Sequence, residues 1–79
     1  MKNIAKLISE NCSLKTIFNG DIVFVTKLNT IMSIRLVNDK LGNEPYYRHY
    51  IFIDDDCGWS IEEKYDTEIE AIEFLKTLI

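Results

Sequence analysis

The chain has 79 residues, a formal net charge of −4 at pH 7, and 47% hydrophobic and 11% aromatic residues. This length is enough for one domain, and the apolar and aromatic content argues against an intrinsically disordered chain. No apolar run approaches the roughly 20 residues that a membrane-spanning helix needs, and the first ten residues are too charged for a signal peptide. We therefore expect a single cytoplasmic domain over residues 1–79.

Charge is distributed unevenly along the chain. Residues 1–51 carry seven basic and four acidic side chains, whereas residues 52–79 carry two basic and nine acidic ones. The last third of the chain thus has a local net charge of −7. Concentrated charge of one sign is typical both of solvated faces and of surfaces that bind oppositely charged partners.

The first predicted element is a short amphipathic helix. Its apolar residues recur at helical spacing and are Ile4, Leu7 and Ile8. Because isolated helices of about ten residues are marginal in water, this helix must dock on the rest of the domain. Runs with the alternation or composition of β-strands follow over residues 14–18, 21–28, 31–37, 46–53 and 59–65. In the last of these runs, Trp59, Ile61 and Tyr65 alternate with Ser60, Glu62 and Lys64.

Turn-forming residues separate these runs. Asn19-Gly20 is the pair most favoured in a type I′ hairpin turn. Residues 38–45 form the longest loop. Three aspartates followed by Cys57 and Gly58, over residues 54–58, predict a tight turn in a second hairpin.

A C-terminal helix is predicted after the strands. Thr67 and Glu70 have the spacing of a capping box, which indicates where the helix begins. Its apolar stripe comprises Ala71, Ile72, Leu75, Leu78 and Ile79. Short connections favour antiparallel neighbours, because a parallel pair needs a long crossover. We expect an α+β fold, an antiparallel β-meander of four to five strands with short N-terminal and C-terminal helices packed on one face.

The strand over residues 46–53 offers one candidate binding surface. Its alternation predicts that the helices are faced by Tyr47, His49, Ile51 and Ile53. The opposite face is predicted to carry Tyr46, Arg48, Tyr50 and Phe52, beside Arg35 and Lys27. Because Tyr and Arg are enriched at binding hot spots, the candidate partner-binding residues of this face are Arg35, Arg48, Tyr50 and Phe52. The alternatives are cross-strand pairs that only stabilise the sheet, and an aromatic platform for single-stranded RNA.

The acidic residues of the last third offer a second candidate surface. The candidate partner-binding residues are Asp54, Asp55, Asp56, Glu62, Glu63, Glu70 and Glu73. Carboxylates on a hairpin and the adjoining helix can imitate a row of phosphates and enter a basic groove, with long-range attraction steering the encounter. The alternative is a solvated face that only maintains solubility.

The sequence contains no recognisable constellation for catalysis or metal binding. The three aspartates at 54–56 are consecutive, whereas calcium ligands alternate in an EF-hand loop. His49 has no nucleophile or second acid–base group in a recognisable pattern. Cys12 and Cys57 form neither a CxxC pair nor a zinc knuckle, and we expect free thiols. We therefore expect no enzyme activity, no cofactor and no metal.

These patterns predict a small acidic protein-binding module, an inhibitor that occupies the basic surface of a nucleic-acid-binding or nuclease effector. Concrete forms are a phage anti-defence protein such as an anti-CRISPR, and an immunity protein. The alternatives are a nucleic-acid-binding module that uses the Arg/Tyr face of the sheet, and a homodimeric structural protein. Overall acidity argues against direct nucleic-acid binding, because phosphate contacts dominate that affinity. No membrane partner is expected.

Overall fold

The computed structural model describes residues 2–18, 20–55 and 57–79. Over these residues the elements are α1 (Lys2–Asn11), β1 (Ser13–Phe18), β2 (Asp21–Val25), β3 (Ile31–Asn38), β4 (Tyr47–Asp55), β5 (Gly58–Tyr65) and α2 (Glu68–Lys76). The strands form one antiparallel sheet in the order β1-β2-β3-β4-β5, so each pairs with the next along the chain. The predicted α+β meander with a helix at each end is confirmed. Within these residues, no helix is long and apolar enough to cross a membrane.

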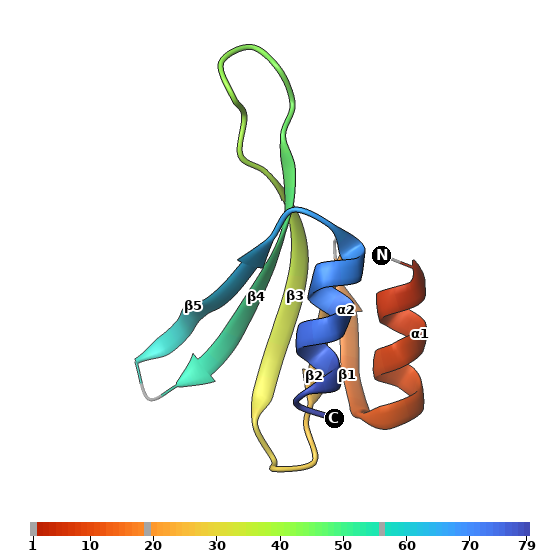
Figure 1. Cartoon of the computed structure of the whole chain (residues 1–79). Helices are drawn as coiled ribbons and strands as arrows, with labels where there is room; N and C mark the ends of the chain where they lie inside the picture. The colour runs from red at the N-terminus through yellow and green to blue at the C-terminus, as the bar shows by residue number, and fades with distance from the viewer. Residues whose placement is uncertain (1, 19, 56) are drawn as a thin grey trace.

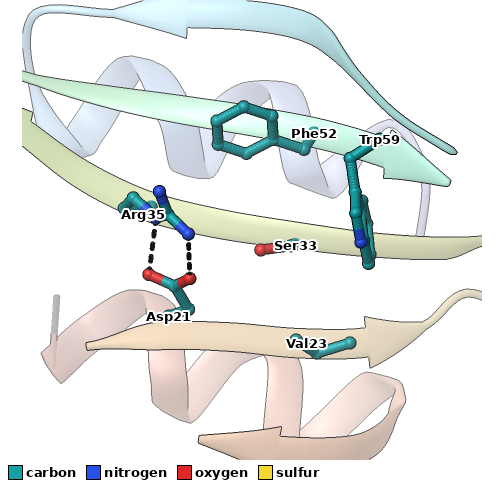
Figure 2. Close-up of a pocket in the computed structure, with 6 residues that line it drawn as sticks. All are labelled: Asp21, Val23, Ser33, Arg35, Phe52 and Trp59. Carbon is teal, nitrogen blue, oxygen red and sulfur yellow. Dashed lines mark hydrogen bonds and ion pairs between the residues drawn. The ribbon is translucent and has the colours of Figure 1, made fainter. Parts of the chain in front are cut away.

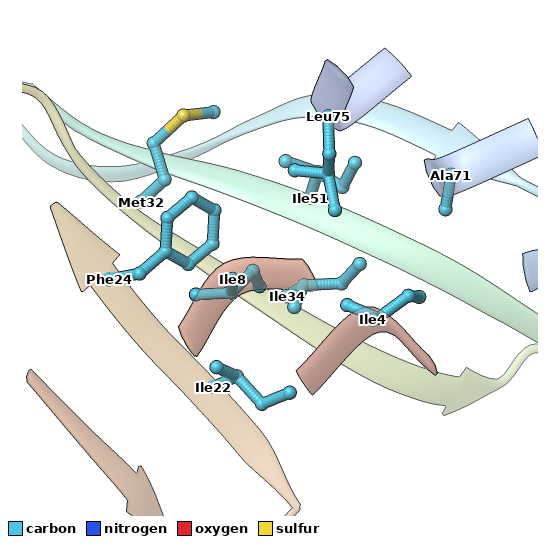
Figure 3. Close-up of a cluster of buried hydrophobic side chains, with 9 residues drawn as sticks. All are labelled: Ile4, Ile8, Ile22, Phe24, Met32, Ile34, Ile51, Ala71 and Leu75. Atoms are coloured by element: carbon cyan, nitrogen blue, oxygen red, sulfur yellow. The ribbon is translucent and has the colours of Figure 1, made fainter. Parts of the chain in front are cut away.

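Both helices pack against the same face of the sheet, and the β4–β5 hairpin extends beyond them (Figure 1). Alternate residues of the central strands meet the apolar stripes of the helices, as the periods of strand and helix require. The resulting core is shown in Figure 3 and comprises Ile4, Ile8, Ile22, Phe24, Met32, Ile34, Ile51, Ala71 and Leu75. Each large apolar side chain buried in this way stabilises the fold by about 1.5–3 kcal/mol.

The predicted cap of the last helix is confirmed. The backbone N–H of Glu70 donates to the Thr67 hydroxyl oxygen at 3.2 Å, and the same hydroxyl donates to the Glu70 carboxylate at 2.8 Å. The cap satisfies one of the N–H groups that have no partner inside a helix. It also fixes the direction in which α2 leaves the sheet.

The second strand is shorter than the sequence pattern predicted. β2 ends at Val25, and the carbonyl of Thr26 accepts a hydrogen bond from the N–H of Asn29 in the following turn. Asn29 has a φ of 65°, a left-handed conformation that asparagine tolerates. Lys27 lies in this turn, beyond the end of the strand. It therefore does not share a sheet face with Arg35, contrary to the prediction.

A β-bulge interrupts the last strand. The pairing of β4 with β5 shifts by one residue, and Glu62 pairs with no residue of β4. A one-residue shift moves the following side chains to the other face of a sheet. Trp59 and Ile61 consequently lie on the face without helices, whereas Tyr65 packs against the core on the helix side. The simple alternation predicted for this strand is therefore wrong.

The first testable consequence concerns the β1–β2 turn. Gly20 has a φ of 84°, and Asn19 lies outside the described residues. We expect Gly20→Val to lower the free energy of unfolding by about 1–3 kcal/mol, because a β-branched residue resists positive φ. A Cβ at Gly20 would have no atom within 4 Å, so the cost is backbone strain rather than a clash.

The matched control is Gly20→Asn, which should retain most of the stability because asparagine tolerates this region. Urea unfolding of both variants measures the difference. Equal losses in the two variants, or no loss in Gly20→Val, would contradict this account of the turn.

Candidate functional site

The face of the sheet opposite the helices, which we term the open face, carries aromatic, apolar and cationic side chains. Its residues on β2 to β5 include Val23, Ser33, Arg35, Tyr50, Phe52, Trp59, Ile61 and Lys64. The side chains of Trp59 and Ile61 are each 51% exposed. Bulky apolar groups are thus left in solvent on a face that no helix covers.

A pocket of about 260 Å³ lies at the centre of this face (Figure 2). It is lined by Asp21, Val23, Ser33, Arg35, Phe52 and Trp59. Ser33 is only 6% exposed, and its hydroxyl has no hydrogen-bond partner among the described residues. The pocket therefore combines aromatic and apolar walls with one free hydroxyl and a charged rim.

The charged rim is an ion pair between neighbouring strands. Arg35 donates from Nε to Asp21 Oδ1 at 2.7 Å and from Nη2 to Asp21 Oδ2 at 2.5 Å. The guanidinium also lies 5.7 Å from the centre of the Phe52 ring. The hydrogen bond to Asp21 raises the pKa of Arg35 above its usual value. Bidentate pairs of this kind are among the stronger polar contacts in proteins.

A second polar group occupies the end of the open face near the β3–β4 loop. Arg48 Nε lies 3.2 Å from a carboxylate oxygen of Asp66, and its Nη1 lies 3.7 Å from one of Asp39. The hydroxyl of Tyr50 donates to Asp39, and that of Tyr46 donates to Asp66. This group ties the loop to the start of α2, and Arg48 is neutralised within it.

The structure brings three of the four predicted sheet-face residues together. Arg35, Tyr50 and Phe52 lie side by side, with the Tyr50 and Phe52 rings 6.0 Å apart, while Arg48 lies at the end of the face. The strand alternation located these residues. The alternation did not reveal that acidic residues from other segments bind Arg35 and Arg48, because those contacts depend on how the chain folds. It also did not reveal that Trp59 lies on the open face, because that position depends on the bulge in β5.

The predicted acidic residues come from consecutive elements at the β5 end of the sheet, and we term this set the acidic edge. Its described members are Asp54, Asp55, Glu62, Glu63, Glu70 and Glu73, from the end of β4, the edge strand β5 and helix α2. Asp56 lies outside the described residues. Burial raises the pKa of Tyr65, and the charges of Glu63 and Glu70 raise it further. Strand β5 and helix α2 therefore place carboxylates around the same tyrosine.

The two aspartates at the hairpin are strand residues and not part of a five-residue turn as predicted. Asp54 pairs with Trp59, and Asp55 pairs with Gly58. Asp55 accepts hydrogen bonds from the Ser60 hydroxyl and from the Cys57 N–H, and these lower the pKa of its carboxyl. Asp55 therefore stabilises the turn itself.

The acidic edge differs from the open face in how its charges are compensated. Among the described residues, no lysine or arginine forms an ion pair with any of its six carboxylates. The arginine ion pairs instead use Asp21, Asp39 and Asp66. Apart from Glu63, which is partly buried, the members of the acidic edge are exposed. They present uncompensated negative charge to solvent.

The remaining reactive side chains are dispersed. His49 is buried on the helix side, where its strand neighbours are Leu36 and Tyr65. Cys12 and Cys57 are both free thiols. In the part of the chain that the structure describes, no group of three histidine, cysteine or acidic residues is placed to hold a metal ion.

No protein-family model matches this chain, and no curated protein or solved structure matches it. Its function must therefore be inferred from the open face and the acidic edge.

The tyrosines beside Arg48 provide a test of this geometry. Their hydrogen bonds to carboxylates raise the pKa of Tyr50, through Asp39, and of Tyr46, through Asp66. A raised pKa means that these bonds stabilise the fold below the ordinary tyrosine pKa of about 10 and are lost as the pH rises through the folded-state value. Stability should therefore fall in alkaline solution.

We expect Asp39→Asn to shift mainly the ionisation of Tyr50 to lower pH, and Asp66→Asn to shift mainly that of Tyr46. NMR titration of the tyrosine ring signals separates the two residues, and each variant is the control for the other. Unchanged titration of both tyrosines in both variants would mean that these hydrogen bonds do not form in solution.

Proposed function

We propose that this chain is a small acidic protein-binding module that inhibits a nucleic-acid-binding or nuclease effector by occupying its basic surface. The observation that carries the proposal is the separation of charges in the fold. Arg35 and Arg48 are held by carboxylates of the same chain, whereas the acidic edge has no cationic partner among the described residues. A partner with a basic groove can bind this edge without breaking an existing ion pair.

The placement of the carboxylates suits such a partner. Glu62 and Glu63 lie at the bulge of the edge strand, and Glu70 and Glu73 lie on the adjoining helix. Charges on two rigid elements keep their spacing, so little conformational entropy is lost when they meet a complementary surface. Exposed charges of this kind act chiefly on the rate and specificity of association.

Direct nucleic-acid binding is the less favoured function. Phosphate contacts supply most of the affinity for nucleic acid and require free cations. The two arginines of the open face are already paired with carboxylates, and Lys64 lies 5.3 Å from the centre of the Tyr50 ring. A phosphate would have to displace these partners on a chain whose net charge is −4.

Two biological forms fit an inhibitor of this kind. One is a phage anti-defence protein of the anti-CRISPR type, and the other is an immunity protein that neutralises a nuclease. In either form the module would work in the cytoplasm, where its target meets nucleic acid. Its carboxylates would take the place of the phosphates that the target normally binds.

The test uses a pair of charge-matched variants. Glu62→Gln with Glu73→Gln removes two charges from the acidic edge, and Glu10→Gln with Glu44→Gln removes two exposed charges elsewhere. We expect the first variant to associate with its partner roughly two- to tenfold more slowly at low salt, with the difference disappearing at high salt. The second variant should retain the wild-type rate. Asp55 is left unchanged because it holds the hairpin.

The partner is to be identified by co-purification with the tagged chain, and association is then followed with purified proteins by biolayer interferometry. Equal rates for the two variants would mean that only net charge matters and that the acidic edge is a solvated surface. A labelled single-stranded RNA and a DNA duplex are the probes for the alternative function. Salt-sensitive binding of either probe by the isolated chain would overturn the proposal.

A further inference from the structure

The open face is an apolar surface that the chain itself leaves uncovered. Trp59 and Ile61 are half exposed on it, next to Phe52 and the pocket. Contiguous apolar patches on a soluble domain mark interaction sites, whereas single exposed apolar residues need no explanation. The exposed apolar residues of the open face therefore indicate that a partner covers it.

The charges of the open face favour a partner whose contacting surface carries no unpaired charge. Arg35 is bound by Asp21 at two points, and Lys64 lies over the Tyr50 ring. The charged groups near its centre are thus already paired, and the exposed carboxylate of Asp54 lies at the hairpin end. A second copy of this chain presents the same internally paired face. It would add no unpaired charge to the centre of the interface.

The shape of the face is also self-complementary. It carries a pocket of about 260 Å³ and, at the edge of that pocket, the half-exposed indole of Trp59. Figure 2 shows the indole standing at one end of the pocket, opposite the Arg35–Asp21 pair. In a two-fold interface the same patch of both chains meets, so each chain supplies both a projecting ring and a pocket.

The size of the face is adequate for a reversible dimer. Strands about 4.8 Å apart, with about 3.3 Å per residue, give the five-stranded face a plan area on the order of 500 Å². Two such faces together bury about 1,000 Å², which is near the lower bound for a biological interface. Interfaces near this lower bound are typical of weak, transient complexes, so we expect dissociation in roughly the micromolar range.

We propose that this chain forms a two-fold dimer in which the two open faces pack together and each Trp59 fills the pocket of the other copy. The Ser33 hydroxyl at the pocket is placed to accept a hydrogen bond from an indole N–H that enters it. The helix members of the acidic edge, Glu70 and Glu73, lie in the other layer, whereas Asp54, which pairs with Trp59, lies at the rim of this interface. The dimer does not rest on the proposed inhibition, because the residues that would anchor it, Trp59 and Ile61, are not members of the acidic edge.

Trp59 is the only tryptophan of the chain and reports on the interface directly. We expect sedimentation velocity to show a monomer–dimer equilibrium across the micromolar range. In the same dilution series, tryptophan emission should move to longer wavelength as the dimer dissociates, because the indole becomes more exposed to water. Both signals should give the same dissociation constant.

Variants identify the surface that is used. Trp59→Thr and Ile61→Lys should each weaken dimerisation about tenfold or more, as truncation of a central anchor or burial of a new charge does. Ile61→Lys keeps Trp59 as a probe and changes a half-exposed residue, so the monomer should remain folded by circular dichroism. The control is Ile69→Gln, because Ile69 is 70% exposed on α2 in the other layer. It should dimerise like the wild type.

Three results would overturn the dimer. The wild type could remain monomeric throughout the dilution series, or the Trp59 and Ile61 variants could dimerise as tightly as Ile69→Gln. The third result is a monomer whose tryptophan emission shifts only when the co-purified effector is added. That result would assign the open face to the effector instead of a second copy.

Discussion

Two helices of ten and nine residues can cover only one face of a five-stranded sheet. Most apolar residues of the central strands that point toward the helices enter the core, where Phe24, Ile34 and Ile51 are completely buried, although Leu36 on the same face is 44% exposed. Residues that point the other way meet no second layer among the elements that the structure describes. The open face must therefore be stabilised within the sheet, by cross-strand contacts such as the Arg35–Asp21 pair and the packing of Arg35 over Phe52.

The exposed edge strand β5 has features that prevent it from pairing with other strands. An exposed edge strand offers unpaired backbone groups to other strands, and natural proteins prevent such pairing with bulges and charged side chains. β5 has a bulge at Glu62 and, next to it, the charged side chains of Glu63 and Lys64. These side chains disfavour the addition of a strand from another protein. A partner at the acidic edge would thus be held through side-chain charge rather than through backbone hydrogen bonds.

Local sequence patterns predicted the parts of the fold that depend on near neighbours. The helical spacing of Ile4 and Ile8, the Thr67 cap and the alternation of residues 49–53 in β4 follow from periods and capping chemistry, and the structure contains all of them. Tyr47, which was predicted to face the helices, is 54% exposed. The bulge at Glu62 was not predictable, because it depends on how β5 aligns with β4. The end of β2 was missed because the turn formed by Thr26 competes with continuation of the strand.

The sequence predicted different properties of the two candidate surfaces. Alternation along one strand places Tyr50 and Phe52 on a common face. The ion pair of Arg35, however, requires knowing that the pairing of β2 with β3 brings Asp21 beside it. The clustering of acidic residues is visible in the sequence, whereas their lack of cationic partners is a property of the folded chain. The charge pattern in the sequence therefore located the acidic residues. The ion pairs of the folded chain distinguished the open face, whose arginines are paired, from the acidic edge, whose carboxylates are not.

Ionic strength acts in opposite directions on the two proposed contacts. Each copy carries a net charge of −4, so two copies repel one another at distances beyond their apolar contact. Salt screens this repulsion over a length of about 8–10 Å at physiological concentration and so favours the dimer. The same screening weakens the attraction between the acidic edge and a basic partner and slows their association. If both proposals hold, rising salt would shift the chain from binding a basic partner toward binding a second copy, and the sign of the salt dependence would identify which surface is engaged.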